Sequence, residues 1–193
     1  MASDPFHMVE MNWSTGNNAM SDRLRKRRLL GCLALAFLLL LPAAASEAGL
    51  PAPSGPVILR VLGDIENANQ GEAAAFDRDM LEALGMETLV TQTAWTEGEV
   101  IFEGVRGSRL LEALGDHGDQ ILAKAINDYS VEIPAADFET NDLFIALKMN
   151  GRYMRVRDKG PIWIIYPFSE RPELDVGTYR NRSIWQLEQL EFR

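Results

Sequence analysis

The chain has 193 residues, with 19 basic and 28 acidic side chains and a formal net charge of −9 at neutral pH. A surface this acidic repels nucleic acid and anionic lipid, so neither is an expected partner. One cysteine and two histidines leave few ligands for a zinc or iron site.

The N-terminus has the pattern of a secretory signal. Five basic residues within 23–28 precede an apolar run over 29–41, and small residues follow at 43–45. The run has 13 residues, whereas a helix that spans a bilayer needs about 20. We predict an N-terminal extension and signal peptide over residues 1–45. The protein is then periplasmic or secreted, with no membrane insertion after cleavage.

Other interpretations of this segment stay open. A retained anchor is one, and translation could begin at Met1 or at Met20. Residues 29–32 match a lipoprotein box, but they lie at the start of the apolar run rather than at its end. Arg27-Arg28 could mark a twin-arginine signal, the route for folded proteins. Because Lys26 precedes that pair and the run is rich in leucine, the general secretory route is favoured.

Cleavage after Ala45 leaves residues 46–193, which carry 14 basic and 25 acidic side chains and a net charge of −11. The single cysteine, Cys32, is lost with the signal, so no thiolate remains as a nucleophile or metal ligand. His117 is then the only histidine, and glycines flank it on both sides in 115–118. This pattern favours a surface loop histidine over the base of a Ser-His-Asp arrangement.

The mature chain begins with residues 46–56, which are rich in alanine, proline and glycine and predict a flexible leader. A first strand is expected over 57–62. A helical stripe of apolar residues follows within 76–84, and Gly85 is the predicted stop. A second short helix, over 110–114, has the same glycine ending.

Four strands are expected in the middle of the chain. Residues 86–95 and 100–102 form a pair around a turn at Glu97-Gly98, and residues 121–126 and 129–133 form the other two.

Asn150-Gly151 is the clearest local signal, because this dipeptide favours a tight type I′ hairpin. Closing the turn pairs Leu147 with Met154 and Ile145 with Val156, so that one face of the hairpin is apolar.

Two segments complete the predicted sheet. Residues 161–167 have no polar face, which predicts a central strand buried on both sides with prolines at its ends. Residues 185–192 fit a strand or a short helix, and a strand is favoured. The fold class is therefore α+β: a single mostly-β domain over 57–193, with a mixed sheet and two or three short helices.

The other face of the hairpin is basic. Arginine forks suit phosphate or carboxylate ligands, so an anion site is one hypothesis. Ion pairing with nearby acids is the favoured alternative. The basic residues concerned are Arg152, Arg155, Arg157 and Lys159.

Five segments, taken in order, carry a family resemblance. They are residues 102–105 with 110–111 (FEGV, LL), 127–134 (NDYSVEIP), 143–146 with Asn150-Gly151, 160–167 (GPIWIIYP) and 183–185 (SIW). In this order they resemble the oxidoreductase molybdopterin-binding domain of the sulfite oxidase type. The resemblance implies a mixed α+β domain that holds a molybdenum–pterin cofactor and transfers oxygen atoms with two-electron redox chemistry.

This chain departs from the family where the chemistry lies. The family's molybdenum ligand is a cysteine, but the corresponding residues 90–95 contain none, and molybdenum in that fold depends on a soft thiolate. Trp163 and Ile184 stand where the resemblance expects an arginine and a lysine. The general secretory route also exports unfolded chains, whereas the pterin is inserted in the cytoplasm.

We therefore expect a non-catalytic binding module of the periplasm or cell exterior. It would bind a small molecule or a membrane-anchored signalling or redox partner. No catalytic residue, metal ligand or cofactor is expected. Residues at family motif positions should line the cleft, with Asp128 orienting a ligand donor; they are Trp95, Asp128, Tyr129 and Trp163. The alternative is a periplasmic oxidoreductase that binds molybdopterin without a cysteine, and a purely structural subunit is a third interpretation.

Overall fold

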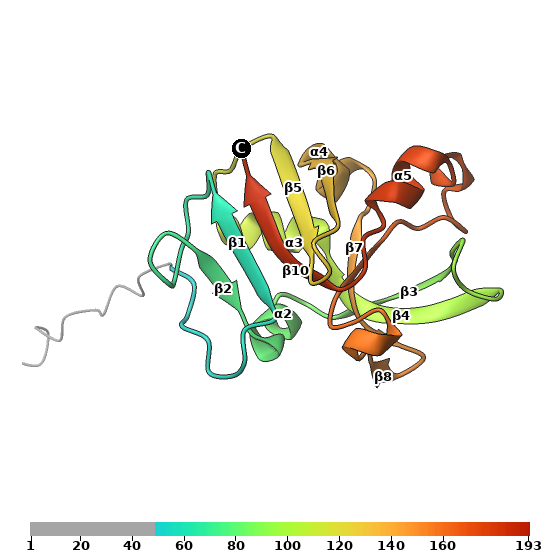
Figure 1. The fold of residues 1–193 in the computed structure, drawn as a ribbon, viewed down its shortest axis with the longest axis horizontal. Coiled ribbons are helices and arrows are strands. Elements are labelled where there is room, and N and C mark those ends of the chain that lie inside the picture. The colour runs from blue at the N-terminus through green and yellow to red at the C-terminus, as the bar shows by residue number, and fades with distance from the viewer. Residues whose placement is uncertain (1–48) are drawn as a thin grey trace, which may run out of the picture. The chain divides into compact units, whose positions relative to one another are not determined.

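The computed structural model describes residues 49–193, whose strands form two five-stranded sheets (Figure 1). The predicted extension and signal peptide, 1–45, lie outside the described residues. The first sheet has the order β2-β1-β10-β5-β6, and only its β1–β10 pair is parallel. Its strands are β1 Leu59–Gly63, β2 Ala74–Phe76, β5 Gln120–Ala125, β6 Ser130–Pro134 and β10 Leu187–Phe192.

The second sheet is antiparallel and has the order β3-β4-β7-β8, with β9 also paired to β7. The long β3–β4 hairpin extends away from the first sheet on the right of Figure 1. The strands are β3 Glu87–Gln92, β4 Glu99–Arg106, β7 Phe144–Met149, β8 Arg152–Tyr153 and β9 Trp163–Ile165.

Short helices connect and cover the sheets. They are α2 Arg78–Ala83, α3 Gly107–Leu114, α4 Ala136–Thr140 and α5 Gly177–Arg182, with the 3-10 helices η1 Val156–Asp158 and η2 Pro172–Leu174. Within residues 49–193, no helix has the length and apolar character needed to cross a membrane. The α+β, mostly-β prediction with a mixed sheet is confirmed, although α4 and α5 were not expected.

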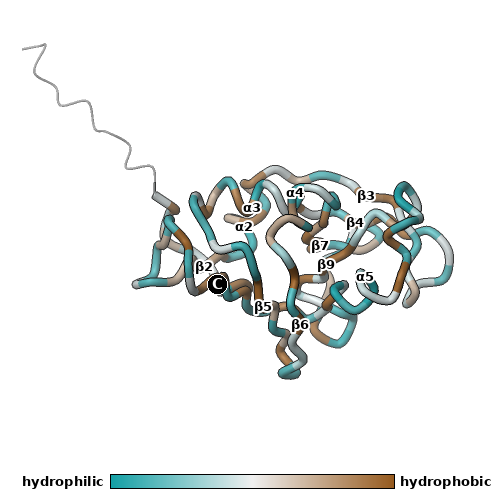
Figure 2. The backbone as a smooth tube through the Cα atoms, turned by 90° about the horizontal axis from the view of Figure 1, so that it is seen from above, coloured by the Kyte–Doolittle hydropathy of each residue, from teal (hydrophilic) through white to brown (hydrophobic). Residues whose placement is uncertain are grey.

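Two hydrophobic cores share the strands β7 and β9. The larger core contains Ile145 and Ile164, together with residues of both sheets and of α2, α3 and α4. The smaller core lies against Phe144, Trp163 and Ile165, the neighbours that point the other way. Alternate side chains of a strand point to opposite faces, so β7 and β9 are covered on both sides. In Figure 2 hydrophobic stretches recur along the chain, near β7 and β9 among other elements, and many outer loops are hydrophilic.

The segment before β1 differs from the flexible leader that the composition predicts. The backbone N–H groups of Ser54 and Gly55 each donate to Asp77 Oδ2 at 2.8 Å, and Leu50 packs against the larger core. The other oxygen of Asp77 accepts from Met80 N–H at 2.9 Å and caps α2. These N–H donors, Met80 first, hold the pKa of Asp77 below its ordinary value. Residues 50–55 are thus attached to the domain.

The hairpin and the strand after it differ in part from the prediction. Met154 N–H donates to Leu147 O at 3.1 Å, as the predicted register requires. Ile145 pairs with Ile164 and not with Val156, because the chain enters η1 after β8. β9 is fully buried as expected; β7 is its only partner among the named strands, and its other edge forms a single bridge, between Trp163 and Trp185. The favoured strand over 185–192 is present as β10.

Candidate functional site

Three segments that are distant in sequence enclose a pocket of about 260 Å³. Trp95 comes from the β3–β4 connection, and Asn127 and Tyr129 come from the turn between β5 and β6. The third wall runs from α5 to the start of β10 and contributes Arg180, Asn181, Ser183, Ile184 and Trp185. We call this site the tryptophan pocket.

Three tryptophans pack edge to face at this site. The ring centroids of Trp95 and Trp185 lie 5.3 Å apart, and each indole also contacts Trp163, at 6.1 and 6.3 Å. Trp163 is fully buried, and its Nε1–H donates to the carbonyl of Ser183 at 3.1 Å. Trp163 therefore packs against both of the other indoles without lining the pocket, and Trp95 and Trp185 line it.

Hydrogen bonds hold the opposite wall in place. The Tyr129 hydroxyl donates to the carbonyl of Asn181 at 3.2 Å, which joins the β5–β6 turn to α5. The backbone N–H of Tyr129 donates to Asn127 Oδ1 at 3.2 Å. Tyr129 is therefore held against α5, although the residue as a whole is half-exposed.

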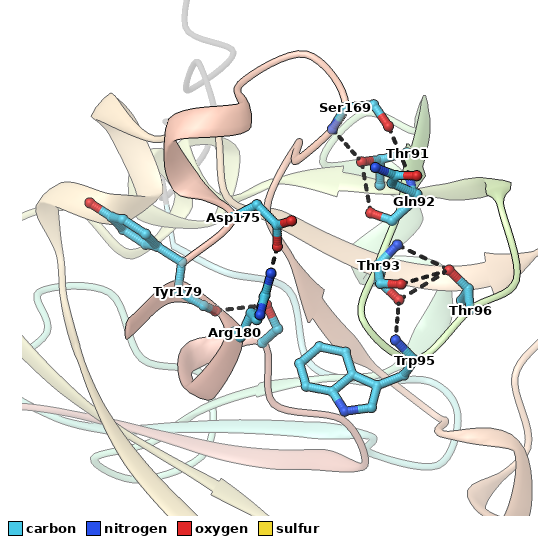
Figure 3. Close-up of polar contacts among 10 residues, drawn as sticks. Thr91, Gln92, Thr93, Trp95, Thr96, Ser169, Asp175, Tyr179 and Arg180 are labelled. Atoms are coloured by element: carbon cyan, nitrogen blue, oxygen red, sulfur yellow. Dashed lines mark hydrogen bonds and ion pairs between the residues drawn. The ribbon is translucent and has the colours of Figure 1, made fainter. Parts of the chain in front are cut away.

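Arg180 is the only charged residue in the lining of the tryptophan pocket, and a carboxylate already neutralises it. Its Nε lies 2.8 Å from Asp175 Oδ1 (Figure 3). Arg180 holds the pKa of Asp175 below its ordinary value, and Asp175 raises the pKa of Arg180. The lining therefore has an apolar aromatic surface in which the one cation is paired, and a second cation, the Lys159 ammonium, lies 4.7 Å from the ring of Trp185.

The structure brings only some of the predicted site residues together. Trp95 and Tyr129 line the pocket, and Trp163 lies beneath it without lining it. Asp128 is not part of the lining: its side chain is 84% exposed, and its Oδ1 pairs with Lys124 Nζ at 2.8 Å. That ion pair lowers the pKa of Asp128. Ile184 and Trp185 also line the pocket, although they are not among the predicted site residues.

Residues 90–95 correspond to the segment that supplies the metal ligand in the family that the chain resembles. Hydrogen bonds occupy the hydroxyl groups of this segment (Figure 3). Ser169 N–H donates to the buried Thr91 hydroxyl oxygen at 3.0 Å, and the Thr93 and Thr96 hydroxyls lie 3.1 Å apart. A neutral threonine hydroxyl does not replace a thiolate as a soft ligand. Within 49–193, no three side chains of His, Cys, Asp or Glu gather as a metal site would require. These residues do not fit a molybdenum centre of the family type.

Two departures from the pattern that the chain resembles lie at or beneath this pocket. Ile184 lines it, and Trp163 lies under its indole rings. These are the positions at which the resemblance expects basic side chains toward an anion. The segment of the third departure, residues 90–95, reaches this pocket only through Trp95.

Comparison with known proteins supports the scaffold alone. No family model matches the chain, and no curated protein matches it. Among solved structures, the sulfane dehydrogenase SoxCD from Paracoccus pantotrophus is similar, with a TM-score of 0.52 and 18% sequence identity. The match covers 69% of this chain and only 37% of that chain. This likeness supports a coarse molybdopterin-oxidoreductase-like fold.

Proposed function

We propose that the chain is exported and that its folded domain is a non-catalytic binding module. The tryptophan pocket would hold a compact, planar and uncharged small molecule. The observation that carries this proposal is the aromatic lining of the pocket, with Ile184 in that lining and Trp163 beneath it where the resemblance expects basic side chains. A ligand ring can stack on Trp95, Trp185 or Tyr129, and no unpaired charge in the lining selects for an anion.

The size of the pocket supports a compact ligand. Its volume of about 260 Å³ lies just below the roughly 300–1,000 Å³ of sites for drug-sized molecules. The lining is mainly aromatic and aliphatic, with amide groups from Asn127 and Asn181 at the pocket as hydrogen-bonding partners.

A matched pair of fluorescent probes tests the ligand class. N-phenyl-1-naphthylamine is neutral, and 8-anilinonaphthalene-1-sulfonate has the same ring system with an added sulfonate. We expect the neutral probe to bind with one-to-one stoichiometry and more tightly than the sulfonate. Tyr129→Ala should weaken binding of the neutral probe by about fivefold, because one aromatic contact contributes about 1 kcal/mol.

Ile101→Ala is the control for Tyr129→Ala. Ile101 is 47% exposed, as is Tyr129, but it lies on β4 and does not line the pocket. The proposal fails if the sulfonate binds more tightly through the same pocket. It also fails if both variants weaken the neutral probe equally.

The alternative function is a periplasmic oxidoreductase that binds molybdopterin without a cysteine, and the scaffold likeness is the observation that favours it. The protein should be purified from a host that makes the cofactor, then assayed for molybdenum and for the fluorescence of oxidised pterin. We expect far less than one molybdenum per chain. Stoichiometric molybdenum would establish the alternative and refute the binding-module proposal.

A further inference from the structure

A second surface of the domain concentrates positive charge. Residues 148–159, which include β8 and η1, contain five basic side chains and one acidic one, Asp158. Residues 46–193 as a whole carry 14 basic and 25 acidic side chains. More than a third of the positive charge of an acidic domain therefore lies within twelve residues, which we call the basic hairpin.

The arginines of the basic hairpin exceed the carboxylates that could neutralise them. Asp158 Oδ2 serves both Arg155 Nε, at 2.6 Å, and Arg157 Nε, at 3.9 Å. Those arginine side chains are 66% and 71% exposed. Within the described part of the chain, no carboxylate oxygen lies within 4.0 Å of the Arg152 guanidinium. The ion pairing that the sequence favoured therefore accounts for only part of the cluster.

Part of the basic hairpin, including Asp158 and Tyr153, lines an open hollow of about 460 Å³. Met149 and Met154 contribute apolar surface, and Arg152 and Arg155 contribute guanidinium groups. The hollow shares no lining residue with the tryptophan pocket. Methionine side chains adapt to varied shapes, and arginine forks recognise carboxylates through paired hydrogen bonds. This combination suits a chain that carries several carboxylates.

We infer that the basic hairpin is a docking surface for an acidic segment of a partner protein. Charge complementarity supports this occupant, because carboxylates from the partner would pair with the arginines that share Asp158 and with Arg152.

The acidic residues at the border of the basic hairpin favour a partner with a small contact area. Glu82 accepts the Tyr153 hydroxyl at 2.5 Å, and Glu103 lies 3.8 Å from Lys148 Nζ, so acids border the basic hairpin. A bilayer or a nucleic acid would bring many phosphates against these acids and against an acidic domain. A single acidic segment can contact the arginines without contacting the bordering glutamates.

The test is binding of a fluorescein-labelled oligoglutamate peptide to the full chain, purified with the processing that its host performs. Fluorescence anisotropy at low and high salt measures the affinity. We expect binding that weakens with salt, since exposed charges are screened. The double variant Arg152→Glu/Arg157→Glu should bind at least about tenfold more weakly.

The control reverses the same number of charges elsewhere. Arg60→Glu/Arg109→Glu alters two exposed arginines on β1 and α3, outside both pockets. It should change the affinity by less than about threefold, the long-range effect of net charge. Circular dichroism melts check that both double variants are folded. The single variant Arg152→Gln gives a milder test, because it removes one positive charge and adds no negative one.

Three outcomes would overturn the inference. The first is no binding of the peptide at low salt. The second is equal weakening in the hairpin and control variants, which would show an effect of net charge alone. The third is hairpin-dependent binding to phosphatidylcholine vesicles that contain phosphatidylglycerol, without binding to the peptide, which would identify a membrane surface. None of these depends on whether the tryptophan pocket binds the naphthylamine probe.

Discussion

Asp137 is a buried carboxylate that connects three elements near the tryptophan pocket. It lies on α4 and accepts hydrogen bonds from the Tyr166 hydroxyl at 2.7 Å and from Arg182 Nη1 at 2.9 Å. Burial, together with the charge of Asp137, raises the pKa of Tyr166, which keeps the phenol protonated as a donor. Because Arg182 is the last residue of α5, this carboxylate fixes the helix that forms one wall of the pocket.

We predict that Asp137→Ala lowers the free energy of unfolding by about 3 kcal/mol, since it leaves Arg182 and Tyr166 without their acceptor. Tyr166→Phe is the comparison, because it removes one hydrogen bond and keeps the ring, at a cost of about 1 kcal/mol. Urea denaturation measures both values. Equal losses in the two variants would show that Asp137 contributes only through Tyr166.

At the residue scale, the family motif at 127–134 identifies positions near the pocket, but it does not identify the directions of their side chains. Tyr129 and Asp128 belong to one motif, yet only Tyr129 lines the pocket. Asp128 has a φ of 64°, and its carboxylate turns to Lys124 four residues earlier in the chain. Such a turn conformation is common for aspartate and depends on local hydrogen bonding, which residue type alone does not reveal.

At the scale of elements, Gly104 shows why one motif position needs glycine. Gly104 lies at a register shift between β4 and β7. A Cβ atom there would collide with the backbone carbonyl of Ile145, which cannot move away as a flexible side chain would. The glycine of the motif at 102–105 thus has a packing role that is independent of any cofactor.

Gly104→Ala should therefore lower the free energy of unfolding by about 1–3 kcal/mol, the usual cost of overpacking. Gly177→Ala is the control, because a Cβ atom at that α5 position meets nothing within 4 Å. It should be neutral or stabilising by up to about 1 kcal/mol. Thermal unfolding distinguishes the two, and a tolerated Gly104→Ala would mean that the strands separate easily there.

Elements with a clear apolar period were predictable, and those without one were not. β5 alternates buried and less buried residues, and its sequence follows that alternation except at Leu122, which is only partly buried. None of the six residues of α5 is buried, so the sequence has no apolar stripe from which this helix could be predicted. β9 has no polar face, which correctly indicates burial on both sides. That pattern cannot say which strands pair with it, because pairing depends on distant parts of the chain.

At the scale of the whole molecule, the shared strands β7 and β9 make the two cores interdependent. Losing the second sheet would expose Ile145 and Ile164 of the larger core as well as Phe144 and Trp163 of the smaller one. The sequence predicts one mostly-β domain, but it gives no sign that the strands divide into two sheets with a core on each face of the second.

We therefore expect the domain to unfold in one cooperative transition. Tryptophan fluorescence reports mainly on the smaller core and the pocket, where three of the four tryptophans lie. Far-UV circular dichroism reports on both sheets. The two urea transitions should coincide. A fluorescence change at lower urea than the circular dichroism change would show that the second sheet opens independently.

Gln186 joins the two surfaces of this domain. Its backbone N–H donates to the carbonyl of Lys159 at 3.0 Å, and its side-chain amide donates to the carbonyl of Val156 at 2.6 Å. The Lys159 ammonium also lies 4.7 Å from the ring of Trp185. Indole emission depends on nearby charge, so Trp185 is a built-in optical reporter. Its fluorescence would report occupation of the tryptophan pocket and movement of the basic hairpin without any attached dye.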